Sequence, residues 1–300
     1  MGTNKKLLKM KSRTLVVFLA GALLLSSCIA LNTDKTTVNI AFRPVIGYDT
    51  RAEESIPFPE DRSFRVWAQD GSAGSVYMSD ERVSYNGGWT TSYIWPERDL
   101  NFEACWPTDL PVEYSARNGI QINAFDCTAG DVDILLAKGS SEQVADGILP
   151  LRFDHILSRL EFRMMHSLAD DISVRLKKIE LKGYAQKGDY NTKTSGKWHV
   201  TEYNASRVVF ESEEGAELVK GEAIYFGEEF YTIPQICVAS VDVYYEVKYQ
   251  YQDATWIPQT ETISKLEIVW DPSKHYTYTL NLCMDKLKHT TGISSWSNRE

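Results

Sequence analysis

The chain has 300 residues and a formal net charge of −9, with sixteen tyrosines, eleven phenylalanines and eight tryptophans. An acidic surface repels phosphate backbones and anionic lipid headgroups, so the charge argues against nucleic acid as a partner and against membrane binding through a basic face. The length suggests two domains of roughly 100–150 residues each. The abundant aromatic and β-branched residues favour strands over helices.

The N-terminus has the layout of a secretory signal peptide. Basic residues between positions 5 and 13 precede an apolar run over residues 15–25, which is shorter than the ~20 residues that cross a bilayer. The run ends in Leu25-Ser26-Ser27-Cys28, which resembles the cleavage site of a bacterial lipoprotein signal. An ordinary cleaved signal with an incidental cysteine is the alternative.

The lipoprotein resemblance implies that residues 1–27 are removed and that Cys28 becomes an acylated N-terminus, with palmitate among its chains. Several acyl chains hold a protein stably on a membrane. Residues 28–37 then form a tether. The removed segment carries five basic and no acidic residues, so the net charge of the remainder falls from −9 to −14.

The first half of the mature chain predicts short strands. Residues 38–42 alternate apolar and polar side chains, and Pro44 restricts this strand to a sheet edge or to its end. Residues 47–62 are polar and predict an exposed loop. Asn86-Gly87-Gly88 is a strong hairpin signal. Further strands are predicted at residues 64–68, 77–85, 93–95, 100–106 and 120–125, and residues 131–137 fit either a strand or a helical turn.

The second half continues in the same way. Residues 159–164 alternate strictly, with Leu160, Phe162 and Met164 on one face. Other strands are predicted at residues 151–155, 174–181, 208–210, 223–226, 230–233, 241–251, 263–270 and 276–282. Many short strands separated by turn signals predict an all-β sandwich or barrel fold. A Gly/Ser-rich patch before Pro150 suggests domains at 38–152 and 153–300.

Polar residues give weak evidence for chemistry. His155 lacks a nearby second histidine, a cysteine or a glycine-rich loop, so a structural histidine bonded to backbone at the domain junction is favoured over catalysis. Asp131 and Asp133 supply only two carboxylates, whereas calcium usually takes six to eight oxygen ligands. The sequence has no signature of an enzyme, a metal site or a cofactor site. We therefore expect no catalytic activity.

Cysteines and tryptophans leave alternatives open. Four cysteines follow Cys28, and an exported protein could pair them, although buried free thiols are slightly favoured. Trp89, Tyr93 and Trp95 could form a platform on which a sugar ring stacks. Burial in the core is the favoured reading of these aromatic residues, because large aromatic side chains are usually mostly buried.

Several landmarks together resemble a known family. They are Phe64–Ala68, Tyr93–Pro96, Leu100–Ala104 with Trp106-Pro107, Asp133–Ala137, Leu151–Leu160, Tyr231–Gln235 and Tyr276–Leu280. Their order and spacing resemble the fimbrillin-like lipoproteins of Bacteroidetes, which supply subunits of type V pili. The resemblance covers nearly the whole mature chain.

The resemblance implies two tandem transthyretin-like β-sandwich domains and a lipoprotein precursor carried to the outer membrane. It also implies that an arginine-specific protease removes the first strand and that a strand from a neighbouring subunit replaces it. Here the removable strand would be residues 36–46, and the scissile bond would be Arg51–Ala52. Arg43 is disfavoured because Pro44 follows it, and Arg62 because it almost adjoins the next strand. The buried row of the removable strand is predicted to be Val38, Ile40, Phe42 and Ile46.

These expectations define a non-enzymatic structural or adhesive pilus subunit at the cell surface. Its partners would be other pilus subunits, the protease, the outer membrane through the lipid anchor, and a ligand on a host or bacterial surface. Residues 283–296 could be a donor strand if they detach, or a fixed last strand. The alternatives are a lipid-anchored outer-membrane glycan-binding protein and, with less support, a degradative hydrolase.

Overall fold

The computed structural model describes residues 38–47, 55–71, 74–129, 131–194, 196–251 and 255–296. The predicted signal peptide, Cys28, the tether and the Arg51–Ala52 bond lie outside these ranges. The described residues form eighteen strands and one short 3-10 helix, η1 (Ser141–Gln143), so the all-β prediction is confirmed. No helix within the described ranges has the length and apolar character that a membrane crossing requires.

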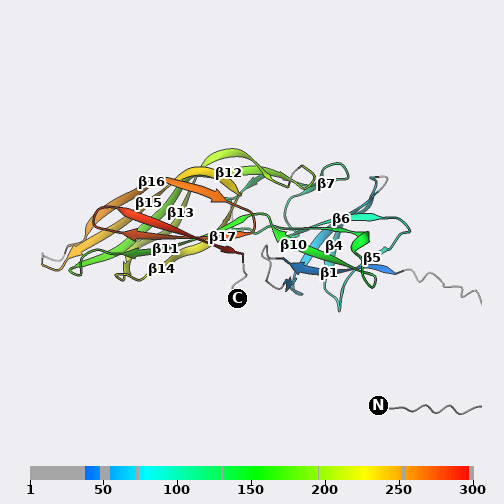
Figure 1. The fold of residues 1–300 in the computed structure, drawn as a ribbon, viewed down its shortest axis with the longest axis horizontal. Coiled ribbons are helices and arrows are strands. Elements are labelled where there is room, and N and C mark those ends of the chain that lie inside the picture. The colour runs from blue at the N-terminus through cyan, green and yellow to red at the C-terminus, as the bar shows by residue number, and fades with distance from the viewer. Residues whose placement is uncertain are drawn as a thin grey trace, which may run out of the picture. The chain divides into compact units, whose positions relative to one another are not determined.

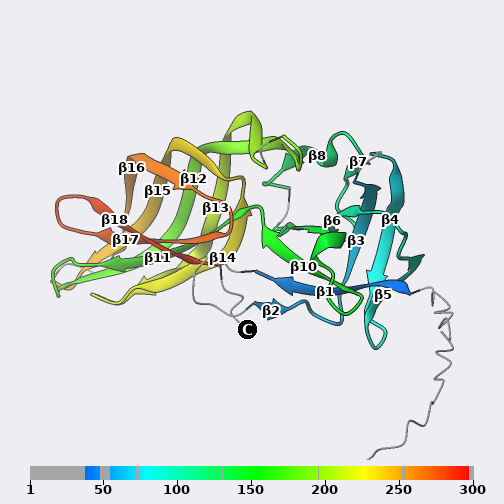
Figure 2. The ribbon, with the colours of Figure 1, turned by 45° about the vertical axis from the view of Figure 1, so that its right-hand side comes forward.

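An eight-stranded sheet contains most of the first half of the chain (Figures 1 and 2). Its order is β2-β1-β10-β9-β6-β3-β4, and β5 also pairs with β1. The strands are β1 (Asn39–Ile46), β2 (Ile56–Pro57), β3 (Ser63–Asp70), β4 (Val76–Ser84), β5 (Trp89–Ile94), β6 (Leu100–Trp106), β9 (Leu135–Ser140) and β10 (Ile148–His155). The sheet encloses an apolar core rich in phenylalanine, including Phe42, Phe58, Phe64, Phe102 and Phe153.

Two further sheets enclose a second core. A six-stranded sheet has the order β16-β15-β12-β8-β7, with β13 also paired to β12, and a four-stranded sheet has the order β14-β11-β17-β18. The six-stranded sheet contains β7 (Glu113–Ser115), β8 (Gly119–Asp126), β12 (Ile172–Asn191), β13 (Trp198–Leu218), β15 (Gln235–Tyr249) and β16 (Ile257–Trp270). The four-stranded sheet contains β11 (Ser158–His166), β14 (Ile224–Thr232), β17 (Lys274–Leu282) and β18 (Leu287–Ser295).

The alternating segment at the start of β11 lies as predicted. Leu160, Phe162 and Met164 are buried in the second core. The polar side chains Arg159 and Glu161 on the opposite face are also buried, with 7% and 5% of their surface exposed. They tolerate burial because they are ion-paired or hydrogen-bonded: Arg159 pairs with Glu229, and Glu161 accepts a hydrogen bond from Thr277. Alternation predicted the two faces but not that both would be covered.

The two halves share strands and a third core. Strand β8 pairs antiparallel with the end of β12, so residues from the first predicted domain complete a sheet of the second. A third apolar cluster joins Trp67 and Ile120 to Ile156 and Trp296. The proposed cut between residues 152 and 153 falls inside β10. The division into two domains remains a prediction.

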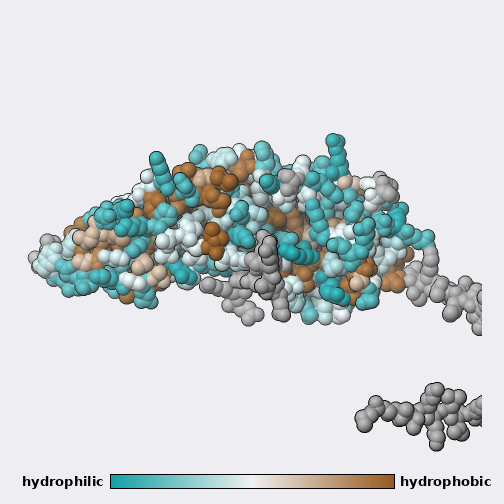
Figure 3. Space-filling model, in the orientation of Figure 1, coloured by the Kyte–Doolittle hydropathy of each residue, from teal (hydrophilic) through white to brown (hydrophobic). Residues whose placement is uncertain are grey.

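The surface exposes few large apolar side chains in any one place. On the face shown in Figure 3, apolar side chains form small groups among hydrophilic ones. Ile236 and Val269 are 82% and 54% exposed and are directly paired between β15 and β16. Isolated groups of this size are normal for a folded protein.

Candidate functional site

Strand β1 covers residues 39–46 of the predicted exchangeable segment 36–46, and it lies inside a sheet. It runs parallel to β10, with Ala41–Ile46 in register with Ile148–Phe153. Its other side pairs antiparallel with β5 and then with β2. The strand is therefore hydrogen-bonded on both sides, and Figure 2 shows it beside β10.

Alternate side chains of β1 point into the first core. Ile40, Phe42 and Ile46 are 0%, 4% and 1% exposed, as the predicted buried row requires. Val38 differs, because it precedes β1 and has half of its surface exposed. Pro44 occupies the remaining inward position between Phe42 and Ile46. The Phe42 ring meets Phe64 and Phe102 edge-on, each at a centroid distance of 5.9 Å.

Pro44 does not restrict β1 to a sheet edge, contrary to the expectation from sequence. The carbonyl of Pro44 accepts a hydrogen bond from the Phe58 amide at 3.2 Å, on the β2 side of the strand. The N and C=O of one strand residue point to the same side, so the missing N–H also faces β2. The ladder to β10 therefore loses no donor, and a proline is compatible with an inner strand here.

The predicted cleavage site joins two paired strands. The described chain stops at Gly47 and resumes at Ser55, and Ile46 is paired with Ile56. The Gly47 amide donates to the Phe153 carbonyl at 2.9 Å. A side chain at this glycine would collide with Arg152. A cut after Arg51 would leave β1 attached to the folded chain only by non-covalent contacts.

The aromatic residues proposed as a glycan platform are packed inward. Trp89 is 9% exposed and contacts Phe58 and Phe64, each at 5.5 Å between ring centroids. Tyr93 and Trp95 are half-buried, and the Trp95 indole donates to the Gly147 carbonyl at 3.2 Å. These contacts favour the core-packing reading, because a buried indole face cannot stack on a sugar.

His155 lies at the junction of the two halves, as predicted, but its ring is bonded to a carboxylate rather than to backbone. Its Nδ1 is 2.9 Å from an oxygen of Asp133, and its ring stacks on Trp296 at 4.1 Å. Trp296 also stacks on Tyr231, with 5.2 Å between the ring centroids. Adjacent Asp154 instead pairs with Arg152. Sequence reasoning missed Asp133 and Trp296 because they are distant from His155 along the chain.

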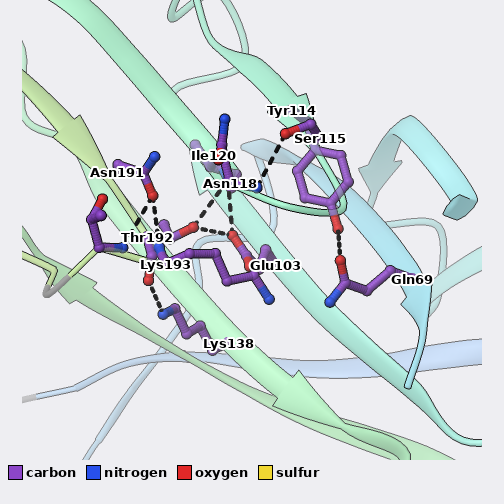
Figure 4. A network of polar contacts seen from close by, with 11 residues as sticks. Gln69, Glu103, Tyr114, Ser115, Asn118, Ile120, Lys138, Asn191, Thr192 and Lys193 are labelled. Atoms are coloured by element: carbon purple, nitrogen blue, oxygen red, sulfur yellow. Dashed lines mark hydrogen bonds and ion pairs between the residues drawn. The ribbon is translucent and has the colours of Figure 1, made fainter. Parts of the chain in front are cut away.

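A buried carboxylate links the eight-stranded and six-stranded sheets (Figure 4). Glu103 of β6 accepts hydrogen bonds from the Ile120 amide at 2.9 Å and from the Thr192 hydroxyl. Lys193 pairs with its other oxygen at 3.2 Å. Burial, followed by the charge of Glu103, raises the pKa of Tyr114 to about 12. Both oxygens of Glu103 therefore have protein partners, as a buried carboxylate requires.

Two other clusters bear on possible chemistry. Among the described residues, Glu161, Glu229 and His275 form the one group with metal-ligand geometry, but Arg159 pairs with Glu229 and His275 lies 3.5 Å from Glu161. Asp131 pairs with Arg207 at 2.7 Å, whereas Asp133 contacts His155 at 2.9 Å. Glu229 and Asp131 are thus paired with arginines, and Glu161 accepts a hydrogen bond from the Thr277 hydroxyl.

The four described cysteines are free thiols, the state that the sequence slightly favours. Cys105 and Cys127 are buried, whereas Cys237 and Cys283 are partly exposed. Burial raises the pKa of Cys105 to about 12, which keeps its thiol protonated and unreactive.

The model of the fimbrillin-like family matches residues 50–296, most of the chain, so the protein belongs to this family. The match begins just after β1. No curated protein matches the chain significantly.

Solved structures share the fold at low sequence identity. A fimbrial protein from Bacteroides vulgatus is 13% identical, with a TM-score of 0.55 over 86% of this chain and 100% of that one. A candidate cell adhesion protein from Bacteroides ovatus is 14% identical, with a TM-score of 0.53 over 88% and 99%. Another from Parabacteroides distasonis is 9% identical, with a TM-score of 0.55 over 86% and 96%.

Proposed function

We propose that this protein is a non-enzymatic subunit of a cell-surface type V pilus and that it joins other subunits by strand exchange. The observation that carries the proposal is the position of β1. This first strand of the described residues inserts three large apolar side chains into a core and is paired on both sides. Among the described residues, it is joined to the rest of the fold only through the segment that contains Arg51.

Loss of β1 would create an acceptor for another strand. Its departure would leave unpaired N–H and C=O groups on β10, β5 and β2, above an apolar slot lined by Phe64 and Phe102. A strand from a neighbouring subunit would satisfy both the hydrogen bonds and the side-chain pockets. An arginine-specific protease that cuts after Arg51 would start this exchange. Membership of the fimbrillin-like family supports assembly with other subunits at the cell surface.

Trypsin treatment of the mature protein tests the acceptor. We expect one early cut after Arg51 and, after it, uptake of a labelled peptide with the sequence of residues 38–47. The Arg51→Ala variant should resist the cut and take up no peptide. Arg62→Ala is the matched control and should behave like the unaltered protein, because this exposed arginine lies beyond the proposed site. Cleavage after Arg51 without peptide uptake would refute strand exchange.

We propose that Cys28 anchors the precursor to the outer membrane. Its position after an apolar segment and Leu25-Ser26-Ser27 supports acylation. The Cys28→Ser variant should lose its lipid mass and move from the membrane fraction to the soluble fraction. An unchanged membrane fraction for this variant would argue against the anchor.

A further inference from the structure

The slot beneath β1 defines the strand that can fill it. The inward positions are occupied in order by Ile40, Phe42, Pro44 and Ile46. The second position is the most demanding, because Phe42 meets two phenylalanine rings edge-on. Edge-on pairs of this kind add about 0.5–1.5 kcal/mol to the burial of the ring itself. The third position needs no N–H on the β2 side, since proline occupies it.

Strand β18 is the obvious donor within the same chain, and its alternation matches this slot only at the ends. Leu287 and Ile293 have the spacing of Ile40 and Ile46. Between them, the Phe42 position would receive His289 in one strand direction and Thr291 in the other. Either residue would place polar atoms against Phe64 and Phe102, where no phenyl ring would replace the one lost. The opposite face of β18 has no large apolar side chain.

The structure also holds β18 in its own sheet. The strand is antiparallel to β17 along its whole length, from Leu282↔Leu287 to Lys274↔Ser295. Leu287 at its start is buried, and Trp296 directly after its end is 2% exposed between His155 and Tyr231. Donating β18 would open this stack and expose both partner rings. The poor match of β18 to the slot and the contacts that hold it in its own sheet both argue against β18 as the donor.

We propose that the β1 slot takes a strand of another subunit whose alternate residues match those of β1, and that β18 stays in its own subunit. At alternate positions the donor strand carries an aliphatic residue, an aromatic residue, a residue that needs no N–H toward β2, and a second aliphatic residue. This inference rests on the proposed exchange of β1 and specifies its partner. The chain therefore does not polymerise with itself through β18.

Competition between peptides for the slot tests the inference. The mature protein is cut after Arg51, or at a specific protease site placed there if trypsin fails, and labelled peptides compete for the slot. The peptide of residues 38–47 should bind roughly a hundredfold more tightly than that of residues 287–296, as expected for losing one buried phenyl ring to a polar residue. Within the first peptide, Phe42→Ala should abolish most binding, whereas Arg43→Ala, which alters an exposed position, should not.

A variant of the 287–296 peptide that gains affinity tests whether the missing phenyl ring causes its weak binding. Replacing His289 or Thr291 by Phe in the second peptide should restore most of the lost affinity, the effective position depending on strand direction. Equal binding of the unaltered 287–296 peptide, or oligomers of the cut protein held together by β18, would overturn the inference but leave strand exchange intact. Failure of the 38–47 peptide to bind would instead refute the proposed function.

Discussion

The first and last strands of the described chain are held in different ways. Strand β1 lies inside a sheet, and its alternate side chains are buried in a core of phenylalanines. Strand β18 is an edge strand, and from Lys288 to Ser294 its side chains are exposed. It is fixed at its two ends, by Leu287 and by Trp296. The comparison indicates that losing β1 opens a core, whereas losing β18 removes an edge.

The largest expected effect is on the β1 side. Phe42→Ala should lower the free energy of unfolding by about 3–5 kcal/mol, because it removes a buried ring and leaves a cavity between Phe64 and Phe102. Denaturant unfolding of the uncut protein measures the change. A loss below about 1 kcal/mol would contradict the view that β1 is part of the core.

At the end of β18, Trp296→Ala should cost about 3 kcal/mol, mainly in local opening of this strand. Amide exchange over residues 287–295 should accelerate strongly, while exchange in β1 changes little. Equal acceleration in both strands would mean that Trp296 supports the whole fold and not β18 in particular.

A change that disturbs the Glu103 network should destabilise β1 and β18 to the same extent. Gly119 has a φ of +67°, and a β-carbon there would collide with Thr192 and Glu103. Gly119→Ala should cost about 2–3 kcal/mol, from backbone strain and a disturbed buried carboxylate. Gly221→Ala is the control, because Gly221 also has a positive φ but open space around it. A similar loss of stability for both substitutions would show that backbone strain alone causes the loss.

Acid should loosen the β18 side first. Burial, together with Lys220, lowers the pKa of His166 below its ordinary value of 6.5. The unfolded chain therefore binds more protons than the folded one between these two pKa values, so stability falls as pH drops from about 7 through that window. His166 is paired with Leu282, which is paired with Leu287 of β18. Between pH 7.5 and 5.5, the thermal midpoint of the His166→Gln variant should fall less than that of the unaltered protein. An equal fall in both proteins would mean that other groups cause the pH dependence.

The smallest change in stability is expected for substitutions in the middle of β18. Ile293 is 64% exposed, so Ile293→Ala should change the free energy of unfolding by less than about 0.5 kcal/mol. Thermal unfolding beside Phe42→Ala gives the direct comparison. A cost above about 1 kcal/mol would mean that the exposed face of β18 is covered by another part of the molecule.

Local patterns carried much of the correct prediction. Alternation along β1 and β11 identified Ile40, Phe42, Leu160 and Phe162 as core residues, because side chains two apart on a strand share a face. The same reasoning placed Val38 in the buried row, although the strand begins one residue later and Val38 is half exposed. Strand ends depend on neighbouring strands, which a local pattern does not contain.

The sequence by itself determined the all-β class, the alternating rows and the resemblance to fimbrillin-like proteins, since each depends on residue order or local spacing. Only the tertiary structure decided that Pro44 fits an inner strand, that β8 joins the six-stranded sheet, and that Asp133 and Trp296 meet His155. Those outcomes depend on which distant segments become neighbours. Pairing between strands far apart in sequence is set by burial and hydrogen bonding across the whole fold, and no window of sequence records it.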